Sequence, residues 1–108
     1  MPDCIFCKIV AGEVPSTKVY EDEEVLAFLN IAPREPQHTL VIPKEHYRWF
    51  YDMPDELSSK VFLVAKKIAR ELKEKTVSDF VQLSLVGKDV PHVHVHLVPR
   101  MLANAPEL

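Results

Sequence analysis

The sequence predicts one α+β domain over residues 1–108, with an antiparallel meander sheet of about five strands, one long helix and one short helix. Two observations support this fold class. Only residues 54–75 show a long helical periodicity, and the β-prone segments occur beside one another rather than alternating with helices. A chain of 108 residues also suits a single domain with its own core.

The first quarter of the chain predicts a short helix followed by a β-hairpin. The helix is expected over residues 4–11, because apolar side chains recur there at helical spacing and Gly12 then ends the segment. Residues 18–21 and 25–30 form the two strands of the hairpin, connected through Asp22 and Glu23. The short helix would carry both cysteines of the chain near its start.

The next segment combines a loop with the strongest central-strand candidate outside the histidine-rich region. Residues 31–37 contain two prolines and predict a loop. Residues 38–42 are strongly β-prone, and Pro43 ends the run. The aromatic residues 44–51 predict at most one helical turn.

The second half predicts the long helix and then two neighbouring strands. Pro54 opens the helix, whose buried face is expected to contain Leu57, Val61, Val64, Ala65, Ile68 and Leu72. The lysines of this helix predict its solvated side. Residues 80–86 and 92–100 form the last two strands, joined by a tight turn over residues 87–91.

Charge and hydropathy exclude two classes of partner. The formal net charge of −3 gives no basic footprint, so we expect no nucleic-acid partner. No apolar run approaches the roughly 20 residues that cross a membrane, and the first residues lack the basic and apolar regions of a signal peptide. A cytoplasmic protein is therefore expected. A small phosphorylated ligand stays open, because it needs only a few local donors.

Three of the five histidines lie at alternate positions from His92 to His96, separated by Val93 and Val95. Successive side chains of an extended strand point to opposite faces, so the three imidazoles share one face and the valines the other. Neighbouring histidines would then lie about 6.6 Å apart along the strand. This arrangement predicts either a metal site or a nucleophilic site.

Cys4 and Cys7 introduce the metal hypothesis. A closed structural zinc site needs four ligands, and His46 and His92 are the natural partners of the cysteine pair. A catalytic zinc held by all three alternate histidines is disfavoured, because they span about 13 Å whereas zinc–nitrogen bonds are about 2 Å. Two of these three histidines could still bind one metal ion together with a third ligand from another part of the chain. The cysteines could instead be small buried residues or a redox pair.

The nucleophile hypothesis centres on His94, which has an imidazole on either side along the strand. A neutral imidazole is a good nucleophile toward phosphorus at neutral pH, and its neighbours could bind phosphate oxygens or orient it. Covalent catalysis would divide a substitution at phosphorus into two in-line steps. Asp89 is the only acidic residue close in sequence to the three histidines.

Three stretches of this chain, in the same order, resemble the histidine triad (HIT) family of nucleotide hydrolases and transferases. They are the segments at residues 4–15, 27–46 and 92–98, so the resemblance spans almost the whole chain. It is closest to the small Hint-like branch, in its bacterial or archaeal form with a Cys-x-x-Cys zinc site. The resemblance implies a HIT-like fold and a homodimer whose sheets join across the interface. It also implies hydrolysis of purine nucleoside phosphoramidates or related nucleotides at the α-phosphate.

The resemblance also implies roles for particular residues. His94 would be the nucleophile and form a nucleotidyl-histidine intermediate, which water then resolves. His96 would bind a non-bridging oxygen of the α-phosphate, and His38 would complete the histidine network. Asn30 would bind the ribose hydroxyls. The residues implied to line the base pocket are Phe6, Ile9, Phe28 and Ile31, and those implied to hold one structural zinc are Cys4, Cys7, His46 and His92.

One departure from the family pattern affects the leaving group. Close relatives of the eukaryotic Hint type have Ser or Thr three residues before the first triad histidine, where it helps to protonate the leaving group, whereas this chain has Asp89. We therefore include Asp89 among the nucleotide-binding residues. Two other enzymes stay open, a dinucleoside polyphosphate hydrolase and a nucleotidyl transferase. A non-catalytic nucleotide-binding regulatory module is the alternative outside enzymes.

Overall fold

The computed structural model describes residues 4–31, 33 and 35–104, and the ends of the expected 1–108 domain lie outside this part. It confirms the α+β class with an antiparallel sheet of five strands. The elements are α1 (Ile5–Val10), β1 (Lys18–Glu21), β2 (Val25–Leu29), β3 (Thr39–Pro43), α2 (Asp55–Lys75), β4 (Phe80–Ser84) and β5 (Val95–Arg100). Two short 3-10 turns, at Phe50–Asp52 and Leu102–Asn104, complete them. No helix in the described part has the length and apolar character needed to cross a membrane.

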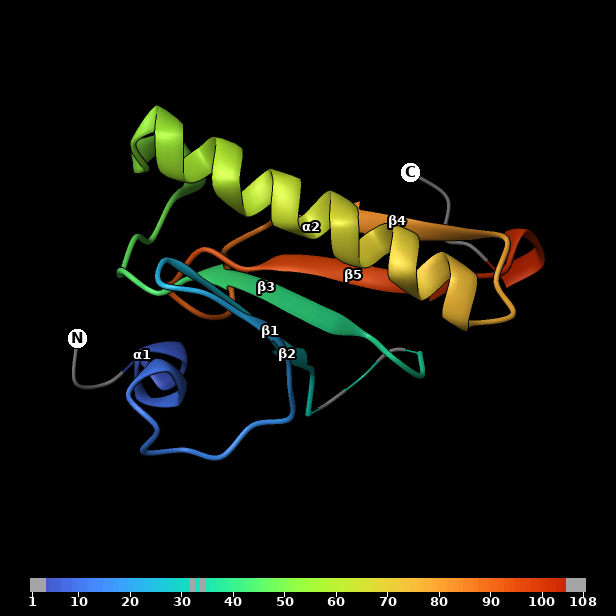
Figure 1. Ribbon diagram of the computed structural model, residues 1–108, viewed down its shortest axis with the longest axis horizontal. Coiled ribbons are helices and arrows are strands. Elements are labelled where there is room, and N and C mark those ends of the chain that lie inside the picture. Colours follow the sequence, from blue (N-terminus) through green and yellow to red (C-terminus); the bar gives the residue numbers. More distant parts are fainter. Residues whose placement is uncertain (1–3, 32, 34, 105–108) are drawn as a thin grey trace.

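The sheet has the strand order β1-β2-β3-β5-β4, and every neighbouring pair is antiparallel (Figure 1). The first three strands form the expected meander, but β5 is inserted between β3 and β4. Both β3 and β4 pair antiparallel with β5, so they run parallel to each other and α2 is the crossover between them. As a result β4 is an edge strand, and β5, which follows the histidines, is central.

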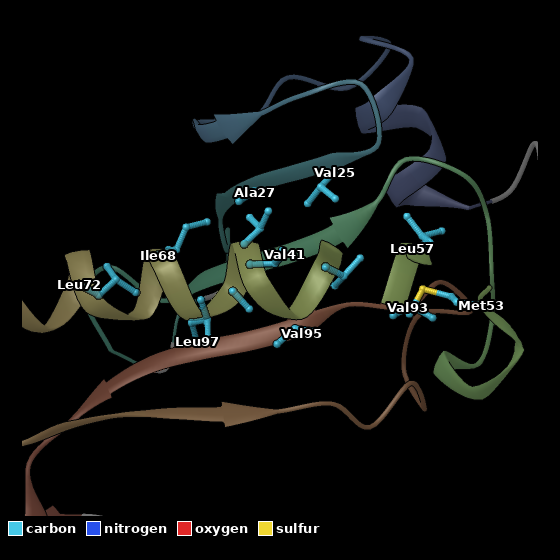
Figure 2. Packing of buried hydrophobic residues seen from close by; sticks show 13 residues of the cluster. Val25, Ala27, Val41, Met53, Leu57, Ile68, Leu72, Val93, Val95 and Leu97 are labelled. Atoms are coloured by element: carbon cyan, nitrogen blue, oxygen red, sulfur yellow. The ribbon is translucent and has the colours of Figure 1, made fainter. Parts of the chain in front are cut away.

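The two helices cover opposite faces of the sheet, with α2 on one and α1 on the other (Figure 1). All six residues predicted to form the apolar face of α2 are buried. Figure 2 shows side chains of this helix packed against residues of β2, β3 and β5 such as Ala27, Val41 and Leu97. On the other face, Phe6 and Ile9 of α1 pack on a second cluster. Burial on both faces explains why β2 and β3 are apolar at nearly every position.

Two predicted boundaries near the histidines are wrong. Strand β5 begins at Val95 instead of His92, and β4 ends at Ser84 instead of residue 86. The connection between them is therefore a ten-residue loop rather than a tight turn. The physical reason is a non-local hydrogen bond: the Val93 amide donates to the carbonyl of Tyr47 at 2.7 Å, so the backbone around the first two triad histidines follows the 44–51 segment.

The alternation of side chains across the sheet is nevertheless as expected. Val93, Val95 and Leu97 are fully buried in the cluster beneath α2. His92 and His94 face the α1 side, because the ring of Phe6 lies 5.9 Å and 5.0 Å from theirs, centroid to centroid. The apolar core therefore determines which face presents the histidines.

A valine pair tests how much this core stabilises the fold. Val61 on α2 is fully buried, whereas Val77 is 96% exposed. We expect Val61→Ala to lower the free energy of unfolding by about 2 kcal/mol, because it removes two buried methyl groups and leaves a cavity. Val77→Ala is the matched control and should change it by less than about 0.5 kcal/mol. Urea unfolding at one protein concentration measures both, and equal effects would contradict the described packing.

Candidate active site and metal site

Two cysteines and two histidines from separate parts of the chain form one cluster. Cys4 caps α1 and accepts a hydrogen bond from the Cys7 amide at 3.4 Å, so both thiols lie on the same side of the helix start. The Cys7 sulfur lies 3.2 Å from Nδ1 of His46, and the Cys4 sulfur lies 3.4 Å from Nδ1 of His92. All four potential ligand atoms lie within 4.8 Å of one another.

This geometry fits a tetrahedral metal site. Zinc bonds of about 2.0–2.3 Å to nitrogen and sulfur place tetrahedral ligands roughly 3.3–3.8 Å apart. His92 Nε2 donates a hydrogen bond to the Pro43 carbonyl at 2.8 Å, which leaves the lone pair of Nδ1 facing the two thiols. Burial lowers the pKa of His92 to about 4 and lowers that of His46, so both rings are neutral at pH 7. These four residues could therefore bind a metal ion, with all four positions filled by protein.

His94 is oriented by the backbone of its neighbour. Its Nδ1 donates to the carbonyl of His92 at 2.7 Å, and the side chain is only 5% exposed. Because a carbonyl can only accept, the neutral ring carries its proton on Nδ1 and its lone pair on Nε2. The His96 ring lies 4.8 Å away, centroid to centroid. The arrangement places an imidazole with an available lone pair beside a second imidazole, which is the geometry that a nucleophilic histidine requires.

His38 and Asn30 complete the polar part of the site. His38 is buried at 1% exposure, and its Nε2 lies 3.0 Å from Nδ1 of His96, so one of these nitrogens donates to the other. The Asn30 amide donates to the His38 carbonyl at 2.8 Å. The end of β2 is thus hydrogen-bonded to the residue immediately before β3, and Asn30 is held beside the histidines.

A cavity of about 260 Å³ lies next to these histidines, slightly smaller than the roughly 300–1,000 Å³ of typical ligand pockets. It is lined by Ile5, Phe6, Ile9, Val14, Pro15, Ser16, Phe28, Asn30, Ile31, Leu40, Asp89, Val90, His94 and His96. All six residues predicted to bind the nucleotide are in this lining. His38 is not, because it lies behind His96. A shallower hollow on the outer face of α2 is lined by lysine, arginine, glutamate and leucine, without a histidine or cysteine.

Several lining residues were not predicted from the sequence. Leu40 is paired with Phe28 across β3 and β2, so the strand alternation offered a signal for it. Val14, Pro15 and Ser16 lie in the loop after α1, and nothing local in their sequence indicates that this loop borders the cavity. Ser16 adds a hydroxyl to the lining that the sequence analysis did not anticipate.

The site thus combines neighbouring histidines, a small and mostly apolar cavity, and a Cys₂His₂ cluster beside a five-stranded antiparallel sheet. The sequence model of the HIT domain matches residues 11–102. The chain therefore belongs to the histidine triad family, as its motifs predicted, and it carries the cysteine pair of the Cys-x-x-Cys branch.

Individual relatives agree with this assignment. The chain is 46% identical over 101 residues to a HIT-like protein of Methanocaldococcus jannaschii, a match that covers 90% of this chain and 78% of that protein. It is 39% identical over 98 residues to the adenosine 5′-monophosphoramidase of Saccharomyces cerevisiae, covering 90% of this chain but only 62% of the yeast enzyme.

Solved structures share the fold over nearly the whole chain. A protein from Streptococcus mutans is 47% identical and superimposes with a TM-score of 0.91, over 100% of this chain and 72% of that one. A zinc-bound histidine triad family protein from Mycobacterium smegmatis is 34% identical with a TM-score of 0.89, over 99% of this chain and 81% of that one.

The orientation of His94 can be tested in solution. We expect the neutral ring to be protonated on Nδ1, because the carbonyl of His92 accepts its hydrogen bond. Long-range ¹H–¹⁵N correlation spectra of the ligand-free protein, recorded at a pH where the ring is neutral, distinguish the two tautomers. His94→Gln identifies the signal of this ring. A ring protonated on Nε2 instead would contradict the geometry and remove the lone pair that the site needs.

Proposed function

We propose that this protein is a nucleotide hydrolase that cleaves purine nucleoside phosphoramidates at the α-phosphate through a nucleotidyl-histidine intermediate on His94. The observation that carries the proposal is the hydrogen bond from His94 Nδ1 to the His92 carbonyl, which leaves Nε2 unprotonated beside the cavity. Membership of the family supports a hydrolase, and so do the yeast relatives named as adenosine 5′-monophosphoramidases.

The reaction takes place in two substitutions at phosphorus. Nε2 of His94 first attacks the α-phosphorus, while the bond from phosphorus to the leaving amine breaks and the amine takes the electron pair and a proton from water. Water then attacks the same phosphorus, His94 leaves, and a nucleoside monophosphate is released. His96 holds a non-bridging oxygen in both steps, and its contact with His38 keeps the ring in position.

The cavity suits a nucleoside. Its apolar part, with Phe6, Ile9, Phe28 and Ile31, offers surfaces on which a purine can stack. The amide of Asn30 can hydrogen-bond to the ribose hydroxyls, and its backbone is already fixed by the bond to His38. With the base and ribose held at these residues, the α-phosphate comes to lie over His94 and His96.

We also propose that the Cys₂His₂ cluster holds one structural zinc ion per chain. A zinc with four protein ligands offers no open position to a substrate, so its contribution is to structure. The helix α1 has only six residues and is too short to be stable alone. A metal held by Cys4, Cys7, His46 and His92 would fasten it to the sheet. Thiols kept in the reduced form favour a cytoplasmic location.

A homodimer is the oligomeric state that we propose. The edge strand β4 has no neighbour on its outer side among the described residues, and its Leu83 is 47% exposed. Unprotected edge strands readily pair with another chain, so a second copy can extend the sheet along β4.

Replacement of the nucleophile tests the proposed function. We expect His94→Ala to lower kcat/KM for adenosine 5′-phosphoramidate by about 1,000-fold or more, because no other group can form the intermediate. Rapid-quench mass spectrometry of the wild type should detect a nucleotidyl adduct on His94. Lys66→Ala, on the outer side of α2, is the control. Full activity of His94→Ala would refute the proposal, and nucleotide binding without adduct or turnover would favour a regulatory module.

The zinc proposal has a separate test. Elemental analysis of protein purified without chelators should find about one zinc per chain. Cys7→Ser should lose most of it, because a hydroxyl replaces a thiolate ligand, whereas His38→Ala removes a buried histidine outside the cluster and should retain it. Equal zinc contents in all three proteins, or none in the wild type, would contradict the assignment.

A further inference from the structure

The cavity lining has an unusual balance of charge. Among the described residues that form it, Asp89 is the one acidic side chain, and no lysine or arginine is present. Sites for polyphosphates neutralise several negative charges with lysine, arginine or metal ions. Here the polar groups near the phosphate position are two imidazoles and a carboxylate. The charged and polar residues of the lining therefore suit a single phosphoryl group better than a polyphosphate.

Asp89 and Asn30 reach the cavity from opposite ends of the sheet. Asn30 follows the end of β2, where Thr39 pairs with Leu97, whereas Asp89 precedes the start of β5 at Val95. Figure 1 shows the loop after β2 at one end of the sheet and the connection between β4 and β5 at the other, on the side of α1. A nucleotide with its ribose at Asn30 and its phosphate at the histidines therefore directs its leaving group toward Asp89.

The backbone on both sides of Asp89 is anchored. Gly87 has a positive φ of 79°, and a side chain there would come within 3.3 Å of the Trp49 ring, so this position packs closely. Val90 packs against the cluster beneath α1, and its carbonyl accepts from the His92 amide at 2.8 Å. The Asp89 side chain is exposed between these anchors, and within the described part of the chain no ion pair involves it. Its carboxylate is thus held at the cavity and free to contact a ligand.

We propose that Asp89 is a specificity residue that selects leaving groups carrying a positive charge. This inference rests on the proposed function and names its substrate class: nucleoside phosphoramidates whose leaving amine bears a second, protonated amino group, as in a short diamine. The carboxylate accepts a charge-assisted hydrogen bond from that ammonium group and repels phosphate or carboxylate groups at the same place. The bond between phosphorus and nitrogen breaks, the diamine leaves with the electron pair and a proton from water, and the nucleotidyl group passes to His94.

Three adenosine 5′-phosphoramidates with arms of similar size test the inference: N-(2-aminoethyl), N-propyl and N-(2-carboxyethyl). For the wild type we expect kcat/KM for the cationic arm to exceed that for the neutral arm about 10-fold and that for the anionic arm about 100-fold. In Asp89→Asn, which keeps the size of the side chain, the three values should lie within about threefold. The preference of the wild type should also weaken at high salt.

A control variant and a binding measurement separate the specificity role of Asp89 from the proposed hydrolase function. Glu23→Gln removes an acid from the turn before β2, outside the cavity, and should keep the preference of the wild type. In His94→Ala, calorimetry of the intact compounds should give the lowest Kd for the aminoethyl arm, and adding Asp89→Asn should abolish this order. If the wild type cleaves all three compounds equally, the role of Asp89 is refuted while the proposed function stands. If it cleaves none of them, the proposed function fails and the specificity role with it.

Discussion

The site depends on the position of one residue, His92, because its ring and its backbone both make contacts. Its Nδ1 faces the cysteine thiols, its Nε2 donates to the Pro43 carbonyl, and its own carbonyl accepts a hydrogen bond from Nδ1 of His94. The first contact connects the residue to α1, the second to the end of β3 and the third to His94. A movement of His92 would therefore displace His94 and the helix that borders the cavity together.

The same segment is held from its other face by the hydrophobic core. Val93, Val95 and Leu97 are fully buried beneath α2, and a slip of one residue would expose them and bury the imidazoles in their place. Such a slip removes several buried side chains from the core, at about 1.5–3 kcal/mol for each. The packing under the long helix thus determines which face of the sheet presents the histidine side chains.

Asn30 and Asp89 both line the cavity, but they are positioned in different ways. Asn30 is fixed by a backbone hydrogen bond to His38 at the end of a central strand, so its position follows from the sheet. Asp89 lies in the loop between β4 and β5 and is positioned by the packing of its neighbours against Trp49 and α1. A loop residue can change without disturbing the sheet, so under the proposed function the specificity at Asp89 could vary independently of the chemistry proposed for His94.

The fold class, the six buried positions of α2 and the face that the triad histidines share could all be predicted from the sequence, because they depend on local periodicity. The start of β5 and the loop before it could not. They are set by the hydrogen bond from Val93 to Tyr47, which joins segments distant in sequence. The positions of Ser16 and Pro15 at the cavity could not be predicted for the same reason, because they depend on contacts between segments distant in sequence. The sequence by itself determined that three imidazoles alternate with a buried apolar stripe. Only the tertiary structure gave each imidazole its own surroundings, because the cysteines, Pro43 and His38 that contact them are brought there by packing and not by the local chain.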